Sequence, residues 1–210
     1  MNWENFNRVA IRMMELAYIN ILWIFFTLVG LGIFGFFPAT TAMFGVIRKQ
    51  LSKEEDIKIF HTFWTLFRQD FMKANGLGLI FAAIAYFLYF DISFIHLNNG
   101  RFDFLLPVIS FILISYIVTI LFIFPVFAYF DLKFLHYIKQ AFLIAITSPI
   151  EVVAIGVVVG ATYFLISLFP GAIPLFSGSI IAYLTTLIGL RAFRRIERKK
   201  FAQQDNKTIL

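Results

Sequence analysis

The sequence contains no cysteine, and only 14% of its residues are charged. The missing cysteine excludes disulfide bonds, thiolate nucleophiles and cysteine-ligated metal sites. The histidines His61, His96 and His136 are scattered and form no H-E-x-x-H motif, so a zinc hydrolase site lacks its ligands. The sequence also lacks a glycine-rich phosphate loop. We therefore expect no catalytic residues, no metal site, no bound cofactor and no enzymatic activity.

Hydrophobic residues are abundant instead, at 60% of the chain, and 29 of the 210 residues are phenylalanine. The few polar groups cannot cover the surface of a soluble protein of this size. The composition therefore predicts an integral membrane protein whose phenylalanine side chains face acyl chains. We expect an all-α polytopic membrane helix bundle that forms one domain over residues 1–190, followed by a basic cytoplasmic tail over residues 191–210.

Several long apolar runs divide the sequence, and about 20 apolar residues suffice to cross a bilayer. The first run is the longest and contains Gly30, Gly32, Gly35 and Pro38, residue types that end or begin helices. We interpret it as a hairpin of two helices, the first ending near Phe34 and the second with Pro38 in its first turn. This interpretation gives six transmembrane helices, and a single crossing gives five as the alternative. Both counts rest on the same five apolar runs, which cover residues 16–46, 76–95, 104–130, 142–169 and 172–190.

The basic residues distinguish the two span counts, because short cytoplasmic loops of membrane proteins are enriched in Lys and Arg. Six spans place all 18 Lys and Arg residues except Arg101 on the side of the two termini. Five spans would move Arg8 and Arg12 to the opposite side. The charge distribution therefore favours six spans, with the N- and C-termini both cytoplasmic.

Two cytoplasmic segments, residues 57–71 and 131–145, show the three-and-four spacing of amphipathic helices. We expect both to lie in the membrane interface, with apolar side chains at the headgroup boundary and basic residues near anionic lipid. The first segment carries an aromatic stripe, for which a partner protein is an alternative contact. The stripe includes Phe60, Trp64, Phe67 and Phe71.

Membrane lipid is the partner that the basic tail predicts. Arg191, Arg194, Arg195 and Arg198 directly follow the last span. A cluster in this position holds the orientation of the protein and attracts phosphate headgroups. The cluster has no interleaved aromatic residues and no nucleic-acid motif, so we expect no nucleic-acid partner.

Three ionisable residues are candidate functional or structural polar sites. Glu151 follows Ser148 and Pro149, a pattern in which serine caps a helix and glutamate reaches back to the cap N–H. The alternative for Glu151 is a proton, cation or substrate site, because ionisable groups are costly in a membrane interior. Asp91 lies in the outer part of its span, where Arg101 is the expected partner of an ion pair.

Gly156 and Gly160 form a G-x-x-x-G pair in the fifth of the six predicted spans. This spacing lets two helix backbones approach closely. We expect the pair to pack against another helix of the same chain, with a homo-oligomer as the alternative. Either use requires that the glycine face meets another helix.

Four motifs carry a resemblance to a known family: FPATTAMFGVIRK at residues 37–49, FHTFWTLFRQDF at 60–71, KANGLG at 73–78 and KQAFLIAI at 139–146. In these stretches the chain resembles the YesL-like family of small bacterial membrane proteins, which have no assigned biochemical function. The resemblance implies no catalytic residues. It does imply a context, because family members commonly accompany ABC importers and enzymes for plant-derived oligosaccharides in Gram-positive bacteria.

From this context we expect a non-catalytic accessory or assembly subunit of a carbohydrate ABC importer. The importer's permease subunits would be its partners, in a bacterial cytoplasmic membrane. A stand-alone small-molecule transporter or channel is one alternative, in which Glu151 and Asp91 would line a polar route. A transporter needs several polar groups near the membrane midplane, whereas the residues in the middle of these spans are mainly Phe, Leu, Ile and Val. The sequence therefore supports a transporter less than an accessory subunit. A membrane sensor or adaptor is a further alternative.

Overall fold

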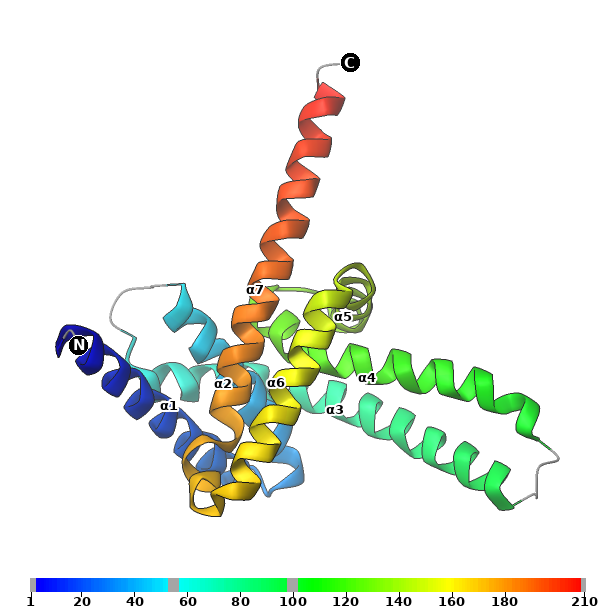
Figure 1. Cartoon of the computed structure of the whole chain (residues 1–210), viewed down its shortest axis with the longest axis horizontal. Helices are drawn as coiled ribbons and strands as arrows, with labels where there is room; N and C mark the ends of the chain where they lie inside the picture. Colours follow the sequence, from blue (N-terminus) through cyan, green and yellow to red (C-terminus); the bar gives the residue numbers. More distant parts are fainter. Residues whose placement is uncertain (1–2, 53–56, 98–101, 209–210) are drawn as a thin grey trace.

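The computed structural model describes residues 3–52, 57–97 and 102–208, with side chains as far as Ile196. The described residues fold as an all-helical bundle, as the composition predicts, and contain no strand (Figure 1). In chain order the elements are α1 (Trp3–Val29), α2 (Ile33–Leu51), α3 (Ile59–Leu97), the 3₁₀ turn η1 (Asp103–Leu105), α4 (Leu106–Tyr129), α5 (Phe134–Thr147), α6 (Pro149–Leu168), the 3₁₀ turn η2 (Pro170–Ala172) and α7 (Ile173–Thr208).

A tight hairpin joins α1 to α2, which confirms the predicted break in the first apolar run. Leu31 and Gly32 adopt positive φ angles of 62° and 72° in the turn. Gly30 and Gly35 face each other so closely that a Cβ atom on either one would collide with the backbone of the other. The two α-carbons can approach this closely only because both residues lack a side chain.

Helix α2 lies at the centre of the molecule, in contact with α1, α3, α4 and α7. Every residue from Pro38 to Ile47 is buried. The helix begins at Ile33, so Pro38 lies inside it rather than at its predicted start, and α1 ends at Val29 rather than near Phe34. The boundaries are earlier than predicted because the chain reverses at the first glycines rather than at the proline.

Among the described residues, 5 helices are long and apolar enough to cross a membrane: α1, α3, α4 with η1, α6, and α7 with η2 as far as Ile196. Helix α2 is the sixth predicted membrane helix, but it is shorter in its apolar part and carries Arg48 and Lys49 in its last turn. The sixth helix therefore exists, enclosed by other helices of the chain rather than standing as a full-length span in lipid.

Helix α3 runs unbroken for 39 residues, where two elements were expected over residues 57–71 and 76–95. The expected separation is wrong because Gly76 and Gly78 do not interrupt the helix. A Cβ atom at Gly76 would lie 2.8 Å from the Phe134 ring, and one at Gly78 would lie 2.6 Å from the Phe37 ring. Both glycines thus provide room for aromatic rings. At about 1.5 Å per residue the helix is roughly 58 Å long, well beyond a hydrocarbon core of about 30 Å.

The second predicted amphipathic segment forms α5, which follows the extended residues 130–133. Helix α5 buries Tyr137, Ala141 and Ile144 and contacts α4 and α6. These residues belong to one apolar core, built from α3 to α7. A second core is built from α1, α2, the start of α3 and α7. Helices α3 and α7 take part in both cores and join the two halves of the bundle.

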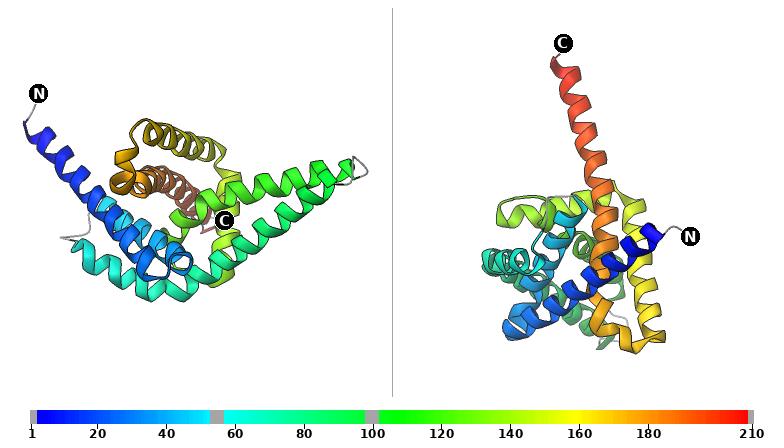
Figure 2. Two further views of the ribbon diagram at one scale, coloured as in Figure 1. Left: turned by 90° about the horizontal axis from the view of Figure 1, so that it is seen from below. Right: turned by 90° about the vertical axis from the view of Figure 1, so that its left-hand side faces the viewer.

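The end of α3 and the start of α4 form a two-helix arm that projects from the bundle (Figures 1 and 2). We define the arm as residues 82–97 and 102–115. Its surface is largely apolar and aromatic, and it offers a broad face to lipid or to another protein. The exposed aromatic residues of the arm include Tyr86, Phe87, Tyr89, Phe90, Phe104 and Phe111.

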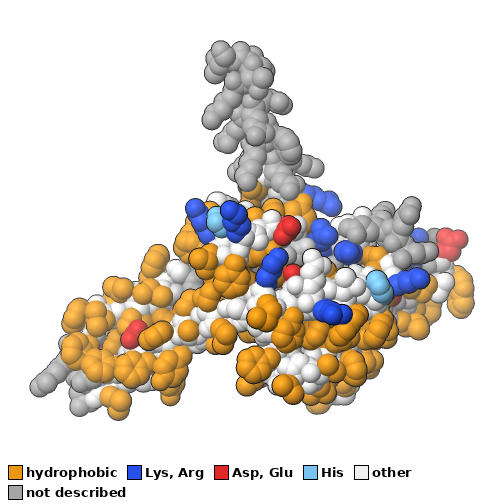
Figure 3. Space-filling model, turned by 180° about the vertical axis from the view of Figure 1, so that it is seen from behind, with side chains coloured by type: hydrophobic (Ala, Val, Ile, Leu, Met, Phe, Trp, Pro, Cys, Tyr) orange, Lys and Arg blue, Asp and Glu red, His pale blue; other side chains and the backbone are white. Residues whose placement is uncertain are grey.

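On the face shown in Figure 3, Lys and Arg side chains gather in a band near the base of the projecting part of α7. Apolar side chains cover the arm and the side away from this projection. Helix α7 continues through the predicted boundary at residue 190 and extends to Thr208. The basic segment after the last span is therefore a helical extension of that span over the residues the structure describes.

We expect Gly30→Ala and Gly35→Ala each to lower the free energy of unfolding by about 1–3 kcal/mol, the usual cost of forcing extra atoms into a packed site. Gly156→Ala and Gly160→Ala are matched controls, because nothing lies within 4 Å of a Cβ atom placed at either position. The controls should be neutral or stabilising, since alanine is the better helix former. Thermal unfolding in detergent, followed by tryptophan fluorescence, compares the four variants. Equal midpoints would contradict the hairpin packing.

Candidate functional site

A polar cavity of about 320 Å³ lies where the end of α2 meets the first half of α3 and the end of α4. Three basic side chains line it, Arg48 and Lys49 from α2 and Lys73 from α3. The carboxylates of Asp70, on α3, and Asp131, after α4, line the same space. We call this site the basic cavity. Its charged residues come from three segments that are distant in the sequence.

Close packing of α2 on α3 positions the basic residues. A Cβ atom at Gly45 would lie 2.7 Å from Cδ1 of Leu66, so the absence of a side chain lets the two helices approach. Arg48 and Lys49 follow one turn later and line the cavity together with Lys73. Cations in the last turn of a helix also interact favourably with its dipole.

The extended residues 130–133 form another wall of the basic cavity. The N–H of Leu132 donates a hydrogen bond to the Tyr137 hydroxyl at 3.1 Å. The buried Tyr137 ring stacks on Phe127, with ring centroids 4.6 Å apart. These contacts tie the linker to α4 and α5, and they hold Asp131 beside the cavity.

The two lysines that line the basic cavity make no direct ion pair with a described carboxylate. The ion pair found among the described residues joins Arg12 to Glu15, both in α1, at 3.0 Å. Neither residue lines the basic cavity. Neither Lys49 nor Lys73 lies within 4.0 Å of a described carboxylate oxygen. Two lysine ammonium groups without a direct ion pair to a described carboxylate favour an anionic ligand at this site.

A second polar site lies inside the bundle, where α1 meets the start of α7. Asn20 is fully buried, and its Nδ2 donates to the carbonyl of Pro174 at 2.8 Å. Its Oδ1 accepts from the N–H groups of Gly178 and Ser179 at 2.9 and 3.0 Å. In a regular helix the N–H of Gly178 would donate to the carbonyl of Pro174. Asn20 therefore joins the backbone ladder of α7 and fixes the start of this helix on α1.

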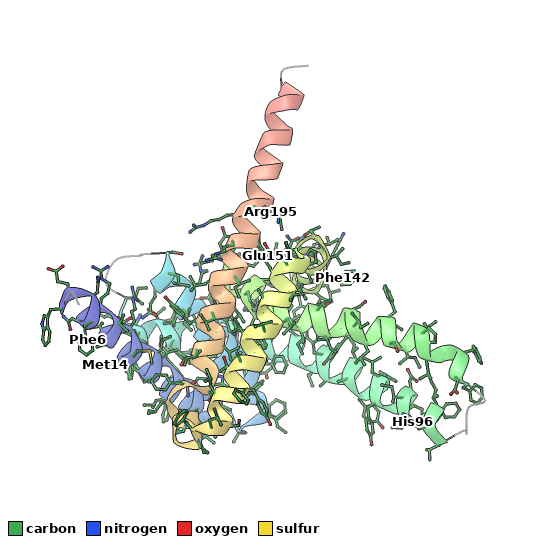
Figure 4. All side chains as sticks on the ribbon, viewed as in Figure 1. Phe6, Met14, His96, Phe142, Glu151 and Arg195 are labelled. Carbon is green, nitrogen blue, oxygen red and sulfur yellow. The ribbon has the colours of Figure 1, made fainter. Side chains whose placement is uncertain are left out.

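Glu151 lies in the first turn of α6, and the predicted start of this helix at Pro149 is confirmed. The predicted serine cap is wrong, because the Ser148 side chain makes no capping hydrogen bond. Oε2 of Glu151 is buried and has no hydrogen-bond partner among the described residues. Figure 4 shows Glu151 and Arg195 at the same end of the neighbouring helices α6 and α7. A functional use of Glu151 stays a prediction.

Asp91 is exposed on the arm, close in sequence to His96, which Figure 4 labels near the tip. No described basic group lies within 4.0 Å of its carboxylate. Arg101 lies outside the described residues, so the predicted ion pair between Asp91 and Arg101 stays a prediction.

The aromatic stripe predicted as a contact surface is only partly exposed. Phe60 and Trp64 are 50% and 41% exposed, whereas Phe67 is 5% exposed. The rings of Trp64 and Phe67 pack on Phe26 of α1, with centroids 5.5 and 5.0 Å apart. Phe71 is half-buried and packs on Phe67. Phe67 therefore belongs to the protein core, and only the outer part of the stripe is open to lipid or a partner.

Gly156 and Gly160 face outward on α6, with no atom within 4 Å of a Cβ atom placed at either. Their predicted packing against another helix of the same chain is wrong. The reason is that α6 turns its other side toward α7, its main contact in the bundle. The homo-oligomer alternative stays a prediction.

The basic residues after the last span are accessible where the structure describes their side chains. Arg191, Arg194 and Arg195 are exposed on α7, and the side chain of Arg198 lies outside the described residues. Their predicted contact with lipid headgroups stays a prediction. Within the described part of the chain, no group of three or more His, Asp or Glu residues is placed to hold a metal ion.

Sequence reasoning missed the basic cavity. Arg48, Lys49 and Lys73 served only to orient the spans, and Asp70 and Asp131 were not singled out. The available signal was that acidic and basic residues lie together at the ends of several apolar runs. That signal cannot show which run ends meet in space.

Comparisons with known proteins identify relatives of this chain. Residues 16–92 match the family described as "Protein of unknown function, DUF624". The chain is also similar to three uncharacterized proteins of Bacillus subtilis (strain 168). It is 33% identical to YteU over 189 residues, which cover 88% of this chain and 83% of that protein. It is 32% identical to YesL over 196 residues, covering 92% of both, and 29% identical to YesV over 184 residues, covering 87% and 88%. No solved structure matches the chain.

We expect Asn20→Leu to lower the free energy of unfolding by about 1–3 kcal/mol, because it leaves the part-buried N–H of Gly178 and the buried N–H of Ser179 without their acceptor. Asn75→Leu is the matched control, since Nδ2 of Asn75 donates to the Phe71 carbonyl one turn earlier in its own helix. Chemical denaturation in detergent measures both. An equal loss in the two variants would show that Asn20 does not anchor α7.

Proposed function

This chain belongs to the YesL-like family of uncharacterised membrane proteins, and from that premise we propose that it is a non-catalytic accessory or assembly subunit of a carbohydrate ABC importer. The carbohydrate context comes from the resemblance to the family. The partners would be the importer's permease subunits, in a bacterial cytoplasmic membrane. The single structural observation that carries the proposal is the arm.

The arm presents polar groups on a surface that is otherwise apolar. Tyr86 and Tyr89 are 67% and 71% exposed, and the carboxylate of Asp91 is exposed between the bundle and the arm's tip. A charged carboxylate facing acyl chains is costly, although the cost is smaller in the outer part of a span, where Asp91 lies, than at the middle of a bilayer. A transmembrane helix of a permease subunit, bringing hydrogen-bond donors, would satisfy these groups better than lipid does.

The polar groups inside the bundle support a packing role more than a solute pathway. Nε1 of Trp23 donates to the Thr40 hydroxyl at 3.0 Å, and that hydroxyl donates to the Phe36 carbonyl at 2.6 Å. The Thr186 hydroxyl donates to the Ala182 carbonyl, also at 2.6 Å. A transporter instead needs polar groups that converge on a substrate near the midplane.

The band of basic side chains supports one orientation in the membrane (Figure 3). Lys and Arg are enriched on the cytoplasmic side of membrane proteins. We therefore place the basic cavity and both termini in the cytoplasm, and the α1–α2 turn and η2 on the outer side.

Cysteine labelling tests this orientation without a background signal, because the native chain has no cysteine. We expect Gly171→Cys, in η2, to react with a membrane-impermeant maleimide added to intact cells. Ser52→Cys, directly after α2, should react only after the cells are permeabilised. Both positions lie outside the core, so the variants should fold. The reverse pattern would overturn the orientation.

The accessory role predicts that a tagged copy, purified from native membranes in mild detergent, carries permease subunits in stoichiometric amount. We expect Phe87→Ala with Phe90→Ala to reduce the recovered permease about tenfold or more, because exposed aromatic anchors dominate many interfaces. Both residues are exposed on the arm. Quantitative mass spectrometry of the purified material gives the ratio.

Phe164→Ala with Tyr163→Ala is the matched control, since these aromatic residues are equally exposed but lie on α6. The control should leave permease recovery unchanged. If the wild-type chain is recovered alone or only with itself, the accessory role is wrong. The transporter alternative would then be supported if proteoliposomes showed solute flux and Glu151→Gln abolished it. The observation that favours this alternative is the buried Oε2 of Glu151, which has no hydrogen-bond partner among the described residues.

A further inference from the structure

We propose that the basic cavity binds the phosphate group of a hydroxyl-bearing phosphate ester. This chemistry is shared by the headgroup of an anionic glycerophospholipid and by a soluble polyol phosphate. The inference is independent of the accessory role, because it concerns the cavity between α2, α3 and the linker after α4 rather than the arm.

The size of the cavity limits the ligand. Small-molecule sites commonly enclose about 300–1,000 Å³, and the basic cavity, at about 320 Å³, lies at the lower end. A phosphate with a short polyol fits this space. A peptide segment or a nucleotide is larger, and a single small anion would leave much of the polar lining without partners.

The basic groups fit a phosphate in number and origin. Lys49 and Lys73 supply point charges from two different helices, and the Arg48 guanidinium has enough N–H donors to bind a phosphate oxygen beside the interaction it already makes. Their positions are fixed by the Gly45–Leu66 contact between α2 and α3. A cluster with a purely structural role would be expected to close into direct ion pairs with the nearby carboxylates. Lys49 and Lys73 make none with the described carboxylates.

The acidic groups explain why the ligand carries hydroxyls. Asp70, Asp131 and the Gln69 amide line the same cavity as the basic residues. Ionised carboxylates are acceptors only, so they need donors and repel a bare phosphate. Hydroxyl groups of a glycerol or other polyol attached to the phosphate supply those donors. The cavity thus offers basic groups for the phosphate and acidic groups for hydroxyls.

The surroundings of the cavity admit a lipid as well as a soluble ester. Leu66, Phe127 and Phe130 form apolar parts of its lining. Its basic residues belong to the side of the molecule where, in the proposed orientation, headgroup phosphates lie. A glycerophospholipid could therefore reach the cavity from the bilayer, and a polyol phosphate could reach it from the cytoplasm.

The test uses the full chain in a neutral detergent and measures binding by native mass spectrometry and by the shift of the thermal midpoint. The probes are short-chain phosphatidylglycerol, short-chain phosphatidylcholine, glycerol 3-phosphate and inorganic phosphate. We expect phosphatidylglycerol to bind more tightly than phosphatidylcholine, which has no headgroup hydroxyl and is zwitterionic. Binding of glycerol 3-phosphate as well would assign a soluble ester, and binding of phosphatidylglycerol alone would assign a lipid headgroup.

Lys73→Gln should weaken binding of the retained probe about tenfold, the usual effect of losing one charge-assisted contact. Lys139→Gln removes the same charge from an exposed position on α5 outside the cavity, and should leave binding within about twofold. Equal effects of the two substitutions would overturn the proposal, because binding would then reflect the overall charge. So would failure of all four probes to bind.

Asp131→Asn tests the hydroxyl contact by the direction of its effect. If Asp131 accepts a hydrogen bond from the ligand, the substitution should weaken binding of the hydroxyl-bearing probe relative to inorganic phosphate. If Asp131 only repels the phosphate, the substitution should tighten binding of both probes alike. The second result would overturn the assignment of a hydroxyl-bearing ester.

Discussion

The structure depends on the burial of residues 38–47 of α2 on all sides. Lipid tails are as apolar as the helix surfaces, so the hydrophobic effect does not drive helices together inside a membrane. Close packing and hydrogen bonds must do so instead, and α2 is built for close packing through small residues such as Ala39, Ala42 and Gly45, which are buried among α1, α3, α4 and α7. Because α2 is too short to present a full apolar length to lipid, the surrounding helices shield it. Its position in turn fixes the relative placement of all four neighbours.

The basic cavity is a consequence of that burial. A buried helix that ends in Arg48 and Lys49 must place these charged side chains in a polar environment, since unsolvated charges are costly. The linker after α4 and the first half of α3 meet the end of α2 there, and both contribute acidic groups. The anchoring of α7 by Asn20 uses the same physics on a smaller scale. In both places the polar groups that surround the side chain come from another segment of the chain.

The sequence predicted where the helices lie along the chain much better than which side chains of different helices contact each other. Apolar length located the membrane helices, and the glycines near residue 30 located the hairpin, because both signals are local. The same signals could not show that Phe67 packs on Phe26, since in a membrane protein a core-facing and a lipid-facing phenylalanine belong to the same apolar pattern. The change from amphipathic to apolar residues near residue 72 suggested two elements but lies within one continuous helix, whereas Gly156 and Gly160 suggested packing but lie in open space. Residue spacing defines a helix face, and only the tertiary fold decides what covers it.

The continuity of α3 links the two surfaces to which we assign binding. Lys73 lines the basic cavity and Phe87 lies on the arm, 14 positions later in one unbroken helix. At about 1.5 Å per residue the two positions are roughly 21 Å apart along the helix axis. An interfacial helix joined to a separate span by a flexible loop would let the two surfaces move independently. A single helix without proline, held near its middle by the Phe37 and Phe134 rings over Gly78 and Gly76, resists such movement. The distance between the cavity and the arm is therefore a fixed property of the fold.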